Sequence, residues 1–191
     1  MDTINLIIGI NIVLMFVANL GAAKKGIRSR IGQTKEKPKG FFQTYPPYIA
    51  TLILILLIIS LFRLGTLDYN GFQLIRMTGA GLYVLSSWMQ VWIYRTLGDN
   101  YSQDIVIYKN HQLIEKGLYR YIRHPYYLFQ ILMDIGAVFA TLSYLLVPIV
   151  VLEIPILIIR GKIEEKLLLK HFPGTFEKYR NHTGFILPFI G

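Results

Sequence analysis

Long apolar runs alternate with shorter polar segments along the chain. Three runs are long enough to cross a membrane, which takes about 20 mostly apolar residues: 4–23, 48–64 and 72–94. Two shorter runs follow at 126–141 and 144–159, separated by a tight turn. The pattern predicts five helical spans, of which the last two form a hairpin.

Composition supports a membrane protein. Apolar residues make up 53% of the 191 residues and charged residues only 16%, whereas a soluble domain carries about 25% charged residues. The chain has no cysteine, which excludes a disulfide framework, a thiol nucleophile and a Cys-type zinc site. We therefore predict an all-α, polytopic membrane protein with a single membrane domain over residues 1–191. Residues 1–95 would supply three spans and a basic loop, and residues 96–191 the hairpin, the tail and a cytoplasmic pocket.

The distribution of charge predicts an orientation. The net charge is +9, and basic residues concentrate in the segments 24–47, 95–123 and 160–191. Positively charged segments stay in the cytoplasm, so five spans with the N-terminus outside place all three there. A cleaved signal peptide would carry positive charge before its apolar run. Here Asp2 precedes the first run and lysines follow it, which argues against a signal peptide. Anionic lipid headgroups explain the basic charge, and we expect no nucleic-acid partner.

The residues that could carry chemistry lie in two polar segments, 95–127 and 160–179, which flank the predicted hairpin. Proline disfavours helix for the residue before it, so His124 lies just outside the helix that Pro125 begins. Arg160 and Glu164 are four residues apart and share a helix face. A basic cap at the membrane interface would also explain the His124 segment, and a simple intrahelical ion pair would also explain Arg160 and Glu164. Spacing alone does not decide between these explanations and a functional site.

Three motifs in these segments resemble those of the isoprenylcysteine carboxyl methyltransferase family, which is related to the phospholipid methyltransferases. The first is the stretch 111–114, and the second is the stretch 117–127, which ends in Arg-His-Pro-Tyr-Tyr. The third runs from Arg160 through Glu164-Glu165 and contains Phe172, Phe176 and Tyr179. The resemblance covers about residues 97–188.

The resemblance implies that S-adenosylmethionine binds in a cytoplasmic pocket from which a lipid tunnel leads into the bilayer. It implies that Arg160 holds the acceptor and serves as the catalytic residue. The cofactor-binding residues that the resemblance implies are His111, Gln112, Leu113, Ile114, Tyr119, His124, Pro125, Tyr126, Tyr127 and Glu164. Methyl transfer from a sulfonium needs alignment and exclusion of water more than acid–base groups.

The expected activity is carboxyl O-methylation of a prenylcysteine-like lipid, because an arginine can grip a carboxylate with two parallel hydrogen bonds. Three alternatives stay open at this point. The acceptor could be a phospholipid amine, or the chain could be an NADPH-dependent, sterol-type membrane reductase. It could also be a non-enzymatic membrane subunit in which Arg160 and Glu164 form only an ion pair.

Other polar residues carry weaker predictions. The histidines lack metal-ligand spacing, so no metal is expected. Asp134 and Glu153 are acids within predicted spans, which makes them either functional or partners in a buried polar contact. The family resemblance does not lead us to expect Asp134. Arg76, near the start of a span, is expected to extend toward the membrane surface.

Small and polar residues in the first three spans are expected to join helices. Asn5, Asn11 and Asn19 should hydrogen-bond to neighbouring helices. The Gly79-Ala-Gly81 sequence lies in an apolar run with no preceding strand, so it predicts close helix packing rather than a dinucleotide-binding loop.

Overall fold

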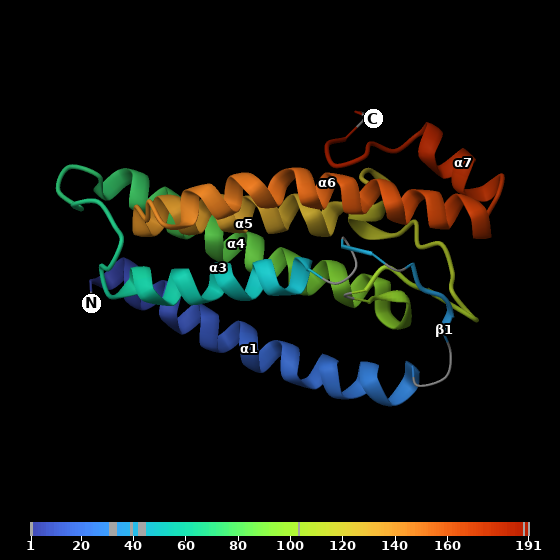
Figure 1. The fold of residues 1–191 in the computed structure, drawn as a ribbon, viewed down its shortest axis with the longest axis horizontal. Coiled ribbons are helices and arrows are strands. Elements are labelled where there is room, and N and C mark those ends of the chain that lie inside the picture. The colour runs from blue at the N-terminus through green and yellow to red at the C-terminus, as the bar shows by residue number, and fades with distance from the viewer. Residues whose placement is uncertain are drawn as a thin grey trace.

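The computed structural model describes residues 2–30, 34–38, 40–41, 45–102, 104–188 and 190, and only the helical backbone for residues 20–30. The fold is an elongated helical bundle (Figure 1). Its helices are α1 (Thr3–Arg30), α3 (Pro46–Leu61), α4 (Gln73–Leu97), α5 (Pro125–Thr141), α6 (Leu146–His171) and α7 (Thr175–Asn181). Its short elements are β1 (Thr34–Glu36), β2 (Ile107–Tyr108), which pairs antiparallel with β1, and the 3-10 helices η1 (Gly98–Asn100) and η2 (Gly117–Arg120).

The prediction of a mostly helical protein is confirmed, and each predicted run corresponds to one long helix. α1 and α6 continue beyond the predicted runs, to Arg30 and His171. In the described part of the chain, however, no helix combines the length and apolarity needed to cross a membrane. The five-span topology is therefore not confirmed. The pairing of β1 with β2 was not predicted, because neither segment shows an alternating apolar pattern.

Prolines and turn residues set the helix boundaries. α3 begins at Pro46 and α5 at Pro125, positions where a missing N–H costs nothing. α5 ends at Thr141, the next residue Leu142 adopts the left-handed conformation with φ of 50°, and the chain reverses into α6. The Ser143 hydroxyl in this turn lies 2.8 Å from that of Ser60 at the end of α3. The predicted hairpin of the last two long helices is thus present, and its turn is hydrogen-bonded to α3.

Helices α4 and α5 pack closely against each other, and two glycines allow the approach. A Cβ added at Gly79 would lie 2.5 Å from the backbone nitrogen of Ala140, and one at Gly136 would lie 2.6 Å from that of Tyr83. Gly81, in contrast, faces open space. The prediction of close packing is therefore confirmed for Gly79 and is wrong for Gly81.

Replacing Gly79 by alanine is expected to destabilise the fold by about 1–3 kcal/mol, because the new methyl group overlaps the backbone of α5. Gly81→Ala is the matched control on the same helix, since both variants gain the same helix propensity. Thermal unfolding followed by circular dichroism should give a lower midpoint for Gly79→Ala than for Gly81→Ala. Equal midpoints would show that α4 and α5 are not in backbone contact at this point.

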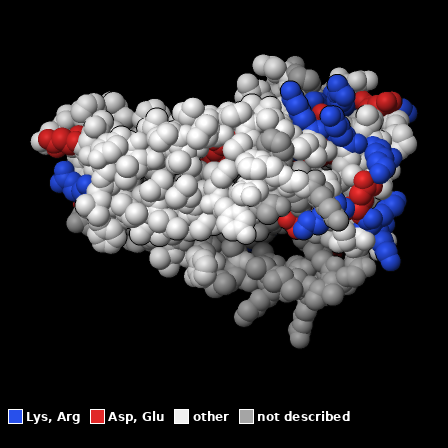
Figure 2. All heavy atoms as spheres, in the orientation of Figure 1, with Lys and Arg blue, Asp and Glu red and all other residues white. Residues whose placement is uncertain are grey.

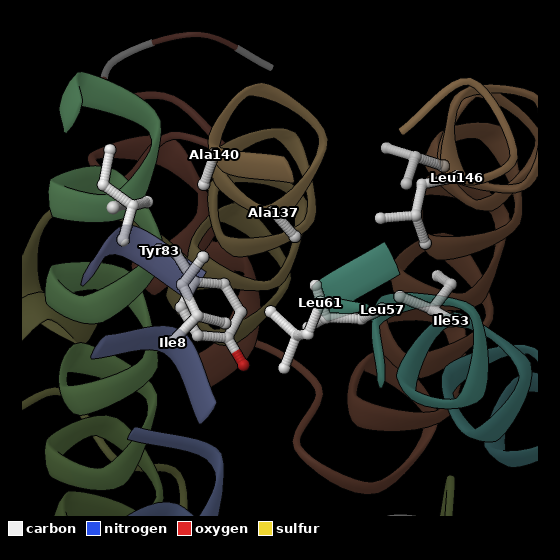
Figure 3. Packing of buried hydrophobic residues seen from close by; sticks show 11 residues of the cluster. Ile8, Ile53, Leu57, Leu61, Tyr83, Ala137, Ala140 and Leu146 are labelled. Atoms are coloured by element: carbon white, nitrogen blue, oxygen red, sulfur yellow. The ribbon is translucent and has the colours of Figure 1, made fainter. Parts of the chain in front are cut away.

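One large apolar cluster contains residues of all five long helices (Figure 3). Small residues of α5 face larger side chains of the other helices, which lets the layers interlock. The buried members labelled in the figure are Ile8, Ile53, Leu57, Leu61, Tyr83, Ala137, Ala140 and Leu146. This core holds α3 and the hairpin at a fixed separation, and that separation defines the cavity described below.

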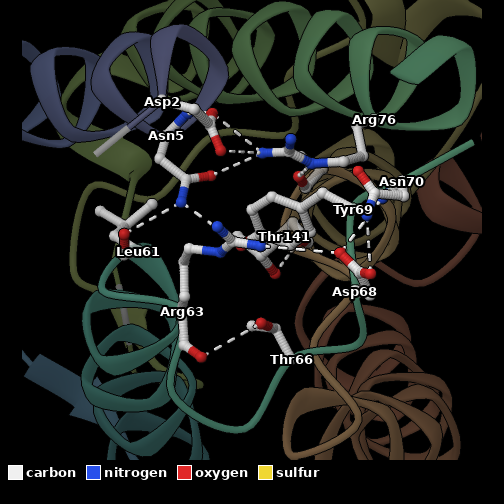
Figure 4. A network of polar contacts seen from close by, with 12 residues as sticks. Asp2, Asn5, Leu61, Arg63, Thr66, Asp68, Tyr69, Asn70, Arg76 and Thr141 are labelled. Carbon is white, nitrogen blue, oxygen red and sulfur yellow. Dashed lines mark hydrogen bonds and ion pairs between the residues drawn. The ribbon is translucent and has the colours of Figure 1, made fainter. Parts of the chain in front are cut away.

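A polar network closes the end of the bundle that holds the N-terminus (Figure 4). Arg76 is only 2% exposed and donates to both carboxylate oxygens of Asp2 and to the side-chain oxygen of Asn5. Its Nε donates to the carbonyl of Ala140, and its guanidinium lies 3.5 Å from the centre of the Tyr69 ring. The prediction that Arg76 extends toward the surface is wrong, because these partners satisfy it inside the bundle.

The asparagines of α1 behave as predicted in two cases of three. Asn5 donates to the carbonyl of Leu61 on α3, and Asn11 donates to Ser87 on α4. Asn19 instead donates to the carbonyl of Met15 within its own helix. A long helix always offers its own carbonyls, so an asparagine in a span is not sufficient evidence for a contact between helices.

Candidate functional site

A cavity of about 510 Å³ lies where α3 and the hairpin meet the loops after α4. One face of α6, from Glu153 to Leu168, forms its long wall, and α3 from Pro46 to Leu54 lies opposite. The loop between α4 and α5, together with α7, closes the remaining sides. The volume is in the range of about 300–1,000 Å³ that ligand pockets occupy.

The two predicted polar segments meet in this cavity. Arg160 lines it together with nearly all the residues proposed for the cofactor. Those lining residues are His111, Gln112, Leu113, Ile114, Tyr119, His124, Tyr126, Tyr127 and Glu164. Pro125 does not line the cavity; it begins α5 and is buried there. Its contribution is therefore to start the helix that presents the two tyrosines.

A chain of polar contacts crosses from α6 to α5. Arg160 Nε donates to the Tyr127 hydroxyl at 3.0 Å, and that hydroxyl donates to Glu164 Oε1. Arg160 and Glu164 are also an ion pair, with 3.7 Å between Nε and Oε1. The predicted ion pair therefore exists, but a tyrosine from a different helix lies between its members and fixes their orientation. Arg160 is 4% exposed, so this pairing offsets the cost of burying its charge.

His124 lies between two carboxylates of α6. Its Nδ1 is 3.5 Å from Glu164 Oε2, and its Nε2 is 3.4 Å from Glu165 Oε1. Burial would lower the pKa of His124, but the two carboxylates outweigh burial and raise that pKa above its usual value of 6.5. The ring also stacks on Tyr127, with 5.4 Å between centroids. His124 is thus favoured in its charged form, beside the Arg160–Tyr127–Glu164 chain.

Glu165 and Arg123 form a second, partly buried ion pair, which the motif comparison did not single out. Arg123 Nε donates to Glu165 Oε1 at 2.6 Å. Burial would raise the pKa of Glu165, but the hydrogen bonds from His124 and Arg123 lower it below its usual value of 4.5. The sequence held a signal for this pair, because each member is adjacent to a predicted site residue, but no spacing rule linked them.

The C-terminal tail holds the His124 segment in place. The backbone N–H groups of Arg123 and His124 donate to the carbonyls of Gly184 and Phe185. The Phe185 ring meets the His124 ring edge-on at 4.8 Å. A Cβ at Gly161 would lie 2.9 Å from Phe185, so this glycine makes room for the tail between α6 and the histidine. Nothing in the sequence pattern predicted this return of the tail.

The far end of the cavity is formed by the loop around His111. The His111 ring lies between Tyr108 and Phe172, with centroid distances of 6.2 and 6.0 Å. Its Nδ1 is buried and has no hydrogen-bond partner among the described residues. Burial, together with the neighbouring His171, lowers the pKa of His111 below 6.5. His111 is therefore favoured as a neutral ring with a nitrogen available for a ligand.

Aromatic rings form another part of the wall. Tyr101 packs between Tyr94 and Tyr126, with centroid distances of 5.3 and 5.9 Å. Both Tyr101 and Tyr126 line the cavity. Tyrosine faces attract cations by roughly 0.5–2 kcal/mol. Tyr101 was not predicted, because it follows a polar turn and matches no motif.

Two polar residues occur at the end of the cavity nearest the apolar core. Gln130 of α5 and Glu153 of α6 both line it, beside Leu54 and Leu157. Glu153 shares a side-chain hydrogen bond with Asp134, to which Gln130 donates at 2.7 Å. The two acids therefore make a buried polar contact with each other, which is one of the alternatives that the sequence left open, and Glu153 also faces the cavity. Among the described residues, no group of three or more ligands could hold a metal ion.

The raised pKa of His124 predicts a pH dependence of stability. A raised histidine pKa stabilises the fold below about pH 6.5, and this stabilisation is lost as the pH rises through the folded-state pKa. The thermal midpoint should therefore fall between pH 6 and pH 8, and fall less in His124→Gln. The lowered pKa of His111 contributes to the pH dependence with the opposite sign. An unchanged slope in the variant would show that His124 is not paired with these carboxylates.

The arrangement defines a class: a helical protein with a polar ligand pocket between a helix hairpin and the loops that flank it. Within that class, residues 79–170 match the model of the isoprenylcysteine carboxyl methyltransferase (ICMT) family. This segment contains the hairpin and most of the cavity wall. The resemblance derived from the three motifs is thereby confirmed.

Two known proteins extend the comparison. The chain is 28% identical over 121 residues to a protein-S-isoprenylcysteine O-methyltransferase of Saccharomyces cerevisiae, a match over 62% of this chain and 51% of the relative. The structure of the eukaryotic intramembrane Ras methyltransferase ICMT is similar with a TM-score of 0.59 and 22% identity, over 77% of this chain and 54% of that one. The likeness establishes a common fold. The chain spans about half the length of both proteins.

Proposed function

We propose that this protein is an S-adenosylmethionine-dependent methyltransferase that methylates a carboxylate of a lipid-like acceptor. The observation that carries the proposal is the meeting of both polar segments in one cavity, with Arg160, Tyr127 and Glu164 linked across it. The yeast relative, a protein-S-isoprenylcysteine O-methyltransferase, supports this choice. A prenylcysteine-like amphiphile with a free carboxylate is the acceptor we favour.

The cavity fits S-adenosylmethionine by the chemistry of its walls. The available nitrogen of His111 and the face of the neighbouring aromatic rings suit an adenosine group. Glu164 keeps lone pairs for an ammonium or a ribose hydroxyl, because a carboxylate has about four acceptor positions. Tyr126 and Tyr101 provide ring faces for a sulfonium. When bound, the cofactor supplies a methyl group on a sulfonium that leaves as a neutral thioether.

Arg160 positions the acceptor in this proposal. A carboxylate is already ionised at pH 7, so it needs a cation to hold it and no base to activate it. With the cofactor bound, a carboxylate oxygen held by Arg160 would take the methyl group, so that an O–CH₃ bond would replace the S–CH₃ bond. The negative and positive charges would cancel, and no proton would be transferred. Burial of Arg160 and Tyr127 keeps water from competing for the methyl group.

We place residues 1–191 in the membrane as one domain with five helical spans, with the N-terminus outside and the site in the cytoplasm. Large apolar side chains such as Phe16, Leu74 and Leu152 are more than 60% exposed on the long helices. Lysines and arginines gather at the end that carries α7, and the long body shows almost no charge (Figure 2). Such a basic end suits anionic lipid headgroups.

The test is transfer of a labelled methyl group from S-adenosylmethionine to membrane lipid extract and to a farnesylated cysteine. A methyl ester releases labelled methanol in mild alkali, whereas a methylated amine does not. We expect alkali-labile label with the wild type and at least 100-fold less with Arg160→Met. Purified protein that neither binds S-adenosylmethionine nor transfers label would contradict the proposal, and NADPH-dependent reduction of a sterol would support a reductase instead.

One observation favours a second acceptor, a phospholipid amine. Methylation of an amine needs a base, and Glu153 places a carboxyl on the cavity wall. Arg160, however, belongs to the motif segment of α6 and pairs there with Glu164, whereas Glu153 lies outside the motifs. The carboxylate therefore remains our first choice of acceptor group. Alkali-stable label would reverse this order.

A further inference from the structure

We propose that Glu165 is a positioning residue of the cofactor site, which holds the His124 ring against Glu164 without itself lining the cavity. The inference rests on the proposed function and adds to it a residue on which the affinity for S-adenosylmethionine depends. The cofactor-binding residues that the resemblance implies do not include Glu165. The inference is carried by the placement of His124 between two consecutive carboxylates of α6.

The two carboxylates of α6 point in different directions. Side chains of consecutive helical residues leave the helix about 100° apart, and Glu164 lines the cavity whereas Glu165 is not among the residues that line it. The His124 ring spans this angle, with its Nδ1 3.5 Å from Glu164 and its Nε2 3.4 Å from Glu165. Because the ring is held at both nitrogens, its contact with Glu165 determines where the nitrogen that faces Glu164 lies.

Glu165 is itself held firmly from the side away from the cavity. Arg123 donates at 2.6 Å to Oε1 of Glu165, the oxygen nearest to His124, and the two side chains of this pair are 3% and 14% exposed. Arg123 also donates to the carbonyls of Arg180 and Thr183 in the C-terminal tail. Hydrogen bonds between charged groups are about twice as strong as those between neutral groups. Glu165 is therefore a fixed anion, and a fixed anion can hold the ring in one place.

The position of the His124 ring reaches the cofactor site by two contacts. One is the direct contact of Nδ1 with Glu164. The other passes through Tyr127, whose ring is stacked on His124 with 8° between the planes and whose hydroxyl donates to Glu164. Glu164 is the carboxylate that we propose for the ammonium or a ribose hydroxyl of the cofactor. Loss of Glu165 should therefore weaken cofactor binding more than acceptor binding, because Arg160 keeps its own bond to Tyr127.

The first measurement is the Kd for labelled S-adenosylmethionine, obtained by equilibrium dialysis of the purified full chain in detergent. Glu165→Gln keeps the size of the side chain and removes its charge. We expect this variant to bind about 10-fold more weakly than the wild type, while the acceptor KM at saturating S-adenosylmethionine changes by less than about 3-fold. Glu177→Gln is the matched control, because Glu177 is an exposed residue of α7 and is not among the residues that line the cavity. Its Kd should equal that of the wild type.

A double-mutant cycle separates positioning through His124 from a general effect on the fold. In the His124→Gln background the ring is absent, so Glu165→Gln should weaken cofactor binding by less than about 2-fold further. Glu165→Asp keeps the charge but withdraws the carboxylate by one methylene, and its Kd should lie between those of the wild type and Glu165→Gln. If Glu165→Gln does not fold, Glu165→Asp replaces it in the cycle, and its loss should likewise disappear without His124.

The outcomes distinguish this inference from the proposed function. A folded Glu165→Gln protein that binds S-adenosylmethionine as tightly as Glu177→Gln would overturn the inference. Equal losses of affinity with and without the His124 ring would overturn it as well, because Glu165 would then act independently of His124. Both results leave the proposed function intact, provided that the wild type binds the cofactor and transfers its methyl group. A wild type that binds no S-adenosylmethionine would overturn both.

Discussion

Replacing Arg160 by methionine should reduce kcat/KM for the acceptor by at least 100-fold. The arginine is 4% exposed, lines the cavity and shares the Tyr127 hydroxyl with Glu164. The loss removes up to two charged hydrogen bonds to the acceptor carboxylate, each worth about 1.5–3 kcal/mol. Methyl transfer at saturating S-adenosylmethionine, with the acceptor concentration varied, measures the effect.

Arg160→Lys is the control for charge, because lysine keeps the cation but lacks the planar fork. It should retain more activity than Arg160→Met while still showing a raised KM for the acceptor. Binding of S-adenosylmethionine should change much less than acceptor KM in both variants. A variant that loses cofactor binding but keeps its acceptor KM would show that Arg160 holds the carboxylate of the cofactor instead.

Replacing Arg76 by methionine should produce the largest loss of stability, about 3 kcal/mol. Breaking a buried ion pair by removing one partner costs about 3–5 kcal/mol, and we take the lower end because Asp2 is partly exposed. The change also removes the hydrogen bonds to Asn5 and to the Ala140 carbonyl. Unfolding in detergent, followed by circular dichroism, measures the loss.

Arg63→Met is the matched control at the same end of the bundle. Its side chain is 57% exposed and lies 3.8 Å from the Asp68 carboxylate, so its removal should cost less than about 1 kcal/mol. Both variants should retain binding of S-adenosylmethionine when folded, because neither residue lines the cavity. Equal losses in the two variants would contradict the structural role given to Arg76.

The sequence predicted the long helices well, because apolar runs and prolines are local signals. α5 begins at Pro125 and ends at Thr141, as the hydrophobic pattern and the Pro-Tyr-Tyr sequence indicate. Contacts between helices were less predictable. Arg76 is buried because Asp2, which is far from it in the sequence, supplies a countercharge. A single sequence does not show which distant residue faces such a group.

The candidate site was predictable to the extent that its residues fall in motifs beside the hairpin. His124, Arg160 and Glu164 meet because the two helices return the chain to the same end of the bundle. The contributions of Tyr101, and of the tail around Phe185, depend on how loops fold over the cavity. Loop packing of this kind leaves no periodic pattern in the sequence, so it became visible only in the structure.

The central claim is that residues from both sides of the hairpin bind one molecule of S-adenosylmethionine. Photolabelling of the purified protein with methyl-labelled S-adenosylmethionine, followed by peptide mapping, tests it most directly. We predict label on peptides from 111–127 and from 160–168, displaced by excess unlabelled cofactor and strongly reduced in Glu164→Gln. Absence of displaceable label, or label confined to peptides far from both segments, would contradict the account.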